Sequence, residues 1–161
     1  MYHRRKILLF AVGLGLVVTV PSCMLLREHS ARVAHRDLAA IVPQIISITL
    51  YDLHINDSHD STALGGAISA PFPADVFTRA ATSAQHRSGT TIWKGSSLAI
   101  LTLRDGTQRR AHFSYYGSFF TLEGISGRFV VPTSTGFQDT FIRFIQERFV
   151  PQRRQRNTRN A

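Results

Sequence analysis

Residues 97–116, SLAILTLRDGTQRRAHFSYY, contain the clearest β-strand signal of the chain. Two runs that mix apolar and polar residues flank Asp105-Gly106, a pair that tolerates the positive φ angles of a type I′ turn. Such a turn joins two antiparallel strands through two residues. The segment therefore predicts a β-hairpin, and the remaining elements are placed outward from it.

Pairing across this two-residue turn assigns the side chains of the hairpin to two faces. The face predicted to pack against the core comprises Leu98, Ile100, Ala111 and Phe113. The opposite face is only half apolar and comprises Ala99, Leu101, Leu103, Arg110 and His112. On that second face, the residues that best fit a surface for contacting a partner are Leu101, Leu103 and Tyr116.

Downstream of the hairpin, two further turns are predicted. Gly117-Ser118 leads into FFTLE, and the turn at 124–127 leads into RFVV. Three hairpin turns in succession predict an antiparallel meander, with TTIW at 90–93 as a further edge strand.

A helix is predicted over 136–149 from a stripe of apolar side chains. Its members recur at helical spacing and are Phe137, Phe141, Phe144, Ile145 and Phe149. Such a stripe indicates a helix face packed against a sheet. Thr135 and Gln138 have the spacing of a capping box, which predicts where the helix starts.

Upstream of the hairpin, a juxtamembrane helix is predicted over 27–42, because Leu38, Ile41 and Val42 lie near one helical face. Pro43 interrupts this pattern.

Between Pro43 and the hairpin, the alternation at 45–53 predicts a strand. Residues 56–61 and 64–73 are rich in Asn, Asp, Ser, Gly and Pro, which predicts a long loop. A short helix is expected at 74–87, after Pro73.

The N-terminus predicts insertion into a membrane. The basic segment 1–6, MYHRRK, precedes an unbroken apolar run at 7–26. As a helix, this run matches the ~30 Å hydrocarbon core of a bilayer. We predict an uncleaved transmembrane signal anchor that contacts the lipid bilayer. The alternatives are a lipoprotein anchored at Cys23, in a sequence loosely like a lipobox, and a cleaved signal peptide.

The orientation follows from charges near the span. Three basic residues flank it on each side, so the positive-inside count ties. The N-side charges lie directly against the span, and large domains translocate largely regardless of their charge. We therefore predict a single-pass protein of the cell membrane with its N-terminus inside and its domain, residues 43–150, extracytoplasmic.

The basic residues are concentrated at the two ends of the chain. Of the net charge of +9, residues 1–36 carry +5 (six Lys/Arg, one acid), residues 37–150 carry 0 (nine of each) and residues 151–161 carry +4 (four Arg). A nucleic-acid-binding domain needs clustered cations on its folded surface, so nucleic acid is not expected as a partner. Residues 151–161 predict a disordered basic tail, either merely solvated or attracted to an anionic lipid or polymer.

One cluster of residues could bind a metal ion. Residues 52–60 contain two imidazoles and three carboxylates, a combination that suits zinc or another divalent cation; they are Asp52, His54, Asp57, His59 and Asp60. These residues lack a helical frame that would fix their geometry, and they are also ordinary loop formers. No metal site, cofactor or catalytic residue is therefore predicted, and His112 has no identifiable orienting partner.

Taken together, the patterns predict an α+β protein. A transmembrane or signal-anchor helix precedes a small domain in which a four- or five-stranded antiparallel meander packs against helices. The expected function is that of a non-enzymatic interaction or envelope-associated domain whose partner is not identified. The alternatives are a metal-binding protein or metal-dependent hydrolase using the 52–60 cluster, and an inverted topology in which the arginine tail contacts cytoplasmic nucleic acid or lipid.

Overall fold

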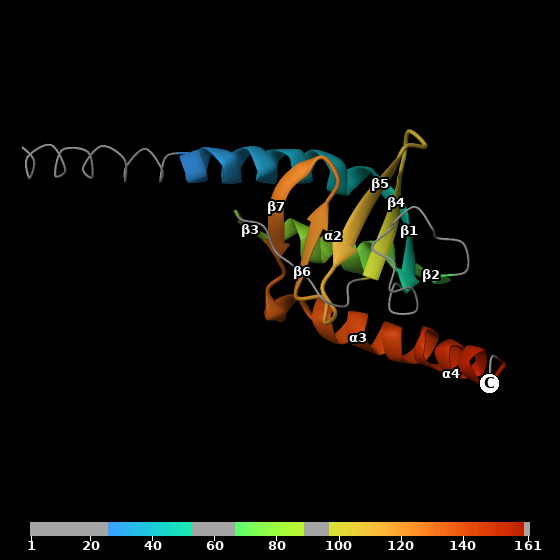
Figure 1. Cartoon of the computed structure of the whole chain (residues 1–161). Coiled ribbons are helices and arrows are strands. Elements are labelled where there is room, and N and C mark those ends of the chain that lie inside the picture. Colours follow the sequence, from blue (N-terminus) through green and yellow to red (C-terminus); the bar gives the residue numbers. More distant parts are fainter. Residues whose placement is uncertain (1–25, 53–66, 89–96, 160–161) are drawn as a thin grey trace, which may run out of the picture.

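The computed structural model describes residues 26–52, 67–88 and 97–159 of the 161-residue chain. These residues form a seven-stranded antiparallel sheet with helices packed on it, which confirms the predicted α+β class (Figure 1). No helix within these three ranges is long and apolar enough to cross a membrane. The predicted span at 7–26, except for its last residue, lies outside the described residues.

The sheet has the strand order β2-β1-β4-β5-β6-β7-β3. Its strands are β1 (Ile45–Asp52), β2 (Ile68–Phe72), β3 (Gln85–Arg87), β4 (Ser97–Leu103), β5 (Gln108–Phe113), β6 (Phe119–Leu122) and β7 (Ile125–Val130). Strands β4 to β7 form the predicted meander. The sheet is larger than predicted because β1 and β2 extend one edge and β3 pairs with β7 at the other.

Three of the four helices contribute to one core on one face of the sheet. The four are the N-terminal helix (residues 26–41), α2 (Ala74–Thr82), α3 (Phe137–Arg148) and α4 (Val150–Arg159). In Figure 1, α2 lies behind the strands, while the N-terminal helix and α3 run along opposite ends of the sheet. Buried residues of the first three helices belong to the same cluster as the inward side chains of the strands.

Phenylalanine dominates the core. The chain has eleven phenylalanines, and eight of them are buried: Phe72, Phe77, Phe113, Phe120, Phe129, Phe137, Phe141 and Phe149. The ring of Phe77 on α2 lies 5.4 Å from that of Phe113 and 5.1 Å from that of Phe120, both edge-on. Since each buried aromatic ring removes ~150–250 Å² of surface from water, these rings supply a large part of the burial that holds the helices on the sheet.

The β4–β5 hairpin is shifted by one residue from the predicted register. Leu103 N–H donates to the carbonyl oxygen of Thr107 at 2.9 Å, and Gly106 N–H donates to Leu103 O at 2.9 Å. The loop therefore has three residues, and Gly106 alone adopts a positive φ, +81°. Asp105 does not adopt the positive φ that a type I′ turn requires, so the predicted two-residue turn is wrong.

The side chain of Asp105 stabilises this three-residue loop. Its Oδ1 accepts hydrogen bonds from Thr107 N–H at 2.9 Å and from the Thr107 hydroxyl at 2.7 Å. An Asp that bonds two residues ahead is typical of a type I turn followed by a glycine in the left-handed region. The sequence predicts the hairpin correctly, but it does not distinguish a two-residue type I′ turn from this three-residue loop.

A shift of one residue exchanges the faces of β4. Ala99 now lies opposite Ala111, and Ile100 lies opposite Arg110. Leu101 and Leu103 are buried in the core, whereas Ile100 is only half-buried on the other face. The predicted partner surface is therefore wrong for Leu101 and Leu103, whereas Tyr116 is exposed. The predicted faces of β5 are confirmed, because Ala111 and Phe113 are in the core and His112 is not.

Several other boundaries can be compared with the sequence. The strand β1, the helix α3 and the end of the N-terminal helix lie within two residues of the predicted positions. The predicted loop at 64–73 contains β2, an edge strand whose Pro71 is exposed, as edge strands allow. The helix predicted at 74–87 ends at Thr82 and is followed by β3. The predicted edge strand at 90–93 lies outside the described residues.

The two ends of the C-terminal helical region differ from the prediction. Helix α3 has Gly136 as its N-cap and no side-chain cap, so the capping box is wrong. Instead, the Thr135 hydroxyl donates to Pro132 O, and the Gln138 side-chain amide donates to Val131 O. Where a disordered tail was predicted at 151–161, the structure has helix α4.

Candidate functional site on the open face of the sheet

The face of the sheet turned away from the helices, called here the open face, carries a row of side chains across three strands. Thr49 of β1 lies opposite Ile100 of β4, which lies opposite Arg110 of β5. Thr102 and Gln108 form the next row. Because neighbouring strands lie ~4.8 Å apart, side chains in one row are in reach of a single small ligand or peptide segment.

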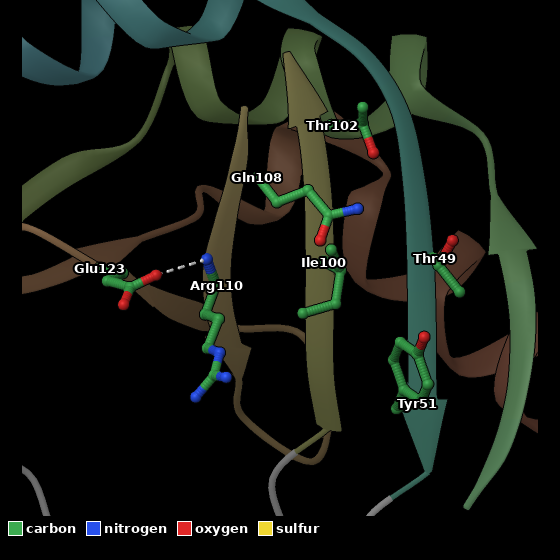
Figure 2. A pocket seen from close by; sticks show the side chains of 7 residues that line it. All are labelled: Thr49, Tyr51, Ile100, Thr102, Gln108, Arg110 and Glu123. Carbon is green, nitrogen blue, oxygen red and sulfur yellow. Dashed lines mark hydrogen bonds between the residues drawn. The ribbon is translucent and has the colours of Figure 1, made fainter. Parts of the chain in front are cut away.

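These rows line a shallow pocket of about 380 Å³. Its lining mixes hydroxyls, an amide, a cation and a carboxylate around one aliphatic side chain: Thr49, Tyr51, Ile100, Thr102, Gln108, Arg110 and Glu123 (Figure 2). Leu98, which lies on the same face beside Tyr51, is fully buried, so the accessible part of the face begins at Ile100. The pocket offers hydrogen-bonding groups around one aliphatic side chain, Ile100, an arrangement that can hold a small ligand or a peptide segment.

Glu123 is attached to the backbone of β5. Its Oε2 accepts a hydrogen bond from Arg110 N–H at 3.1 Å, and Glu123 N–H donates to Arg110 O at 2.8 Å. Figure 2 shows the guanidinium of Arg110 directed away from the Glu123 carboxylate. The carboxylate thus ties the β6–β7 turn to β5, and the cation of Arg110 is exposed at the edge of the pocket.

His112 lies next to this pocket, two residues beyond Arg110 on the same face of β5. Partial burial lowers the pKa of His112 below its ordinary value of 6.5, and the positive charge of Arg110 lowers it further. The charge of Glu123 opposes both effects on this pKa. The lowered pKa favours the neutral form of His112 at neutral pH, mainly because of burial and secondly because of the charge of Arg110.

Two more arginines continue the open face toward the β3 edge. Arg128 of β7 lies directly opposite Arg87 of β3. The guanidinium carbon of Arg128 lies 5.4 Å from the centre of the Phe119 ring, a cation–π contact that keeps the cation on this face.

The structure places Asp52, one of the five possible metal ligands, in an ion pair. Both carboxylate oxygens of Asp52 accept hydrogen bonds from the guanidinium of Arg153 on α4, and Asp52 is almost fully buried. The other four residues of the cluster, His54 to Asp60, lie outside the described residues. Within the part of the chain that is described, no three His, Cys, Asp or Glu side chains are grouped so as to hold a metal ion.

The chain matches no protein-family model, no curated protein and no solved structure. Function is therefore inferred from the geometry of the open face. Sequence alternation correctly placed Arg110 and His112 on that face but misplaced Ile100 by the shift in register. Nothing in the sequence indicated the role of Glu123, which depends on the turn that brings it beside β5.

Proposed function

We propose that this protein is a single-pass, membrane-anchored interaction protein. Residues 7–26 hold it in the cell membrane, and its α+β domain lies on the extracytoplasmic side and binds a partner without catalysing a reaction. The observation that carries the proposal is the one-sided sheet: helices cover one face, and the other presents a pocket lined by mixed polar groups.

The connection between anchor and domain supports this arrangement. Residues 26–41 are helical directly after the predicted span. Ala34 and Leu38 of this helix are buried in the core. His35 Nε2 accepts a hydrogen bond from the backbone N–H of His86 on β3, at 3.2 Å. The helix that follows the anchor is therefore part of the domain, and it would hold the sheet at a fixed orientation to the membrane.

Cysteine labelling tests the topology, because Cys23 is the only cysteine of the chain. In a Cys23→Ser background, Gln146→Cys places a thiol on an exposed position of α3. Tyr2→Cys is the matched control on the N-terminal side of the span. A membrane-impermeant maleimide should label the Gln146→Cys variant in intact cells and the Tyr2→Cys variant only after permeabilisation.

The opposite pattern of labelling would place the domain in the cytoplasm and overturn the proposal. The Cys23→Ser variant also distinguishes a transmembrane anchor from a lipid attached at Cys23. A signal anchor keeps the Cys23→Ser chain in the membrane fraction after an alkaline wash, whereas loss of a lipid attached at Cys23 would release it.

A further inference from the structure

The N-terminal helix (residues 26–41) is hydrogen-bonded to the sheet through the imidazole of His35. His35 Nε2 accepts a hydrogen bond from the backbone N–H of His86 on β3, at 3.2 Å. Within the described part of the chain, no other hydrogen bond links this helix to a strand. Strand β3 is at the edge of the sheet, and Figure 1 shows the helix continuing beyond it toward the N-terminus. The bond therefore lies where the helix leaves the sheet.

The two histidines use their Nε2 atoms in opposite ways. A backbone N–H only donates, so Nε2 of His35 accepts through its lone pair and carries no proton. Nε2 of His86 lies 2.9 Å from the carbonyl oxygen of Ser126, which only accepts, so this nitrogen carries a proton. A further proton would leave the bond of the His86 ring intact, but it would remove the acceptor of His35. Of the two contacts, the one made by His35 therefore depends on pH.

Both imidazole rings are held by the buried side chain of Phe129. The His35 ring lies 5.9 Å from the Phe129 ring and the His86 ring lies 5.5 Å from it, both in T-shaped contacts. The His86 ring also lies directly against Gly127 of β7, where a Cβ atom would collide with its Nε2. His35 thus faces a donor at a fixed position.

The strands beside His35 supply no carboxylate for a protonated imidazole. Strands β3 and β7 contain no acidic residue, and Arg87 and Arg128 alternate with His86 and Phe129, so they leave these strands on the other face. The titratable group that faces His35 from β3 is the imidazole of His86, with the two ring centres 6.4 Å apart.

The charged neighbours of His35 on its own helix are already paired with each other. Arg32 forms an ion pair with Glu28 at 3.1 Å, and Arg36 forms one with Asp37 at 3.2 Å. A proton taken up by His35 therefore breaks a hydrogen bond and gains no ion pair in return.

We propose that His35 is a pH-sensitive contact between the N-terminal helix and β3. The bond is made while the imidazole is neutral, and it is released when His35 takes up a proton as the pH falls through the range of about 5 to 8 in which histidines titrate. The apolar contacts of Ala34 and Leu38 do not depend on pH, so the helix stays on the sheet while its contact with the β3 edge loosens. An acidic exterior would thereby change how the anchor holds the domain, a consequence that rests on the proposed anchoring.

Hydrogen exchange measured by NMR on the full chain in nanodiscs tests the proposal. With ¹⁵N-labelled histidine, the backbone N–H of His86 is one of only seven labelled groups. Its protection, corrected for the pH dependence of the intrinsic exchange rate, should fall about two- to tenfold between about pH 8 and about pH 5, as expected for the loss of one hydrogen bond.

Two variants identify the group that responds. His35→Gln replaces the imidazole by a side chain that does not titrate, so the protection of the His86 N–H should no longer depend on pH. Because His35 is exposed, this substitution leaves the core intact. His29→Gln, at another exposed position of the same helix, is the matched control and should keep the response of the unaltered chain.

Three results would overturn the inference: protection that does not change with pH in the unaltered chain, a response that persists in His35→Gln, or a response that is lost in His29→Gln. A response that persists in His35→Gln would assign it to the ring of His86 itself. These outcomes do not depend on the side of the membrane on which the domain lies, which the thiol labelling measures separately.

Discussion

The two faces of the sheet are built from the same strands but have opposite chemistry. On the face toward the helices, β4 presents Ala99 and Leu101, both fully buried. On the open face, the same strand presents Ile100 and Thr102, both partly exposed. An antiparallel sheet can keep one face in water because its backbone hydrogen bonds are made within the sheet. The domain thus obtains much of its stability from one face, while the other keeps polar and partly exposed side chains around Ile100.

The contrast extends to how each face is held. Aromatic rings interlock on the buried face, where Phe113 lies between the rings of Phe77, Phe137 and Phe141 at 5.4–5.9 Å. The open face is organised by polar contacts, such as Glu123 to the β5 backbone. Substitutions should therefore affect stability on one face and binding on the other.

The largest expected effect is on the buried face. Phe141→Ala should lower the free energy of unfolding by ~3–5 kcal/mol, because it leaves a cavity where α3 meets the sheet. Urea unfolding followed by circular dichroism measures this. Thr49→Ala on the open face is the control and should change stability by less than ~0.5 kcal/mol. A similarly small change for Phe141→Ala would show that α3 does not cover the sheet.

Neighbouring residues of β4 provide a sharper test. Leu101→Ala should cost ~2–5 kcal/mol of unfolding free energy, because Leu101 is fully buried. Ile100→Ala should cost clearly less, since its side chain is partly solvated before the substitution. The same urea titration measures both. A larger loss for Ile100→Ala than for Leu101→Ala would mean that Ile100 faces the core, as the register of the two-residue turn predicts.

That register marks the limit of what the sequence could predict. The hairpin, the meander and the apolar stripe of α3 follow from local patterns, and all three are present. The choice between two turns depended on the hydrogen bonds of Asp105 to Thr107 and on Gly106, a difference of one residue. Because the side-chain period of a strand is two, that one residue decided which face Ile100 occupies.

The pairing of β3 with β7 and of Asp52 with Arg153 could not be predicted for a different reason. Asp52 and Arg153 are 101 residues apart. No local pattern joins positions so distant, and only the packed fold brings them together. Residues 151–161 contain few apolar side chains, and such a composition predicts disorder. In the structure, Arg153 of this segment instead binds the buried carboxylate of Asp52.

Removing that ion pair should have a moderate effect. Arg153→Gln leaves the buried Asp52 carboxylate without its guanidinium partner, and a cost of ~1–3 kcal/mol in unfolding free energy is expected. Water reaches Arg153, whose side chain is 23% exposed, so the full cost of breaking a buried pair is not expected. Arg154→Gln, at the exposed neighbouring position, is the control. Equal effects of the two variants would mean that α4 is not held by Asp52.

The coupling of Asp52 and Arg153 can be separated from their individual effects. In a double-mutant cycle with Asp52→Asn, the two losses should not add, because each substitution removes the same contact. Additive losses would show that the two side chains act on stability independently.

The smallest expected effect concerns a charge on the open face. The pKa of His112 lies below 6.5, first because of partial burial and then because of the charge of Arg110. Arg110→Gln should therefore raise the pKa of His112, and Glu123→Gln should lower it further. Titration of the imidazole proton resonances by NMR measures both shifts. A pKa that responds to neither substitution would place these side chains apart and remove the local basis of the open-face site.

The same lowered pKa predicts how stability depends on pH. The unfolded chain binds a proton at His112 more readily than the folded chain does, so the contribution of His112 is complete above pH 6.5 and is lost as the pH falls through the folded pKa. His112→Gln should remove this part of the pH dependence and leave the rest. Stability that instead increased on acidification through this range, and lost that increase in the variant, would mean that the folded protein favours the imidazolium. The charge of Glu123 would then outweigh burial and the charge of Arg110 at His112.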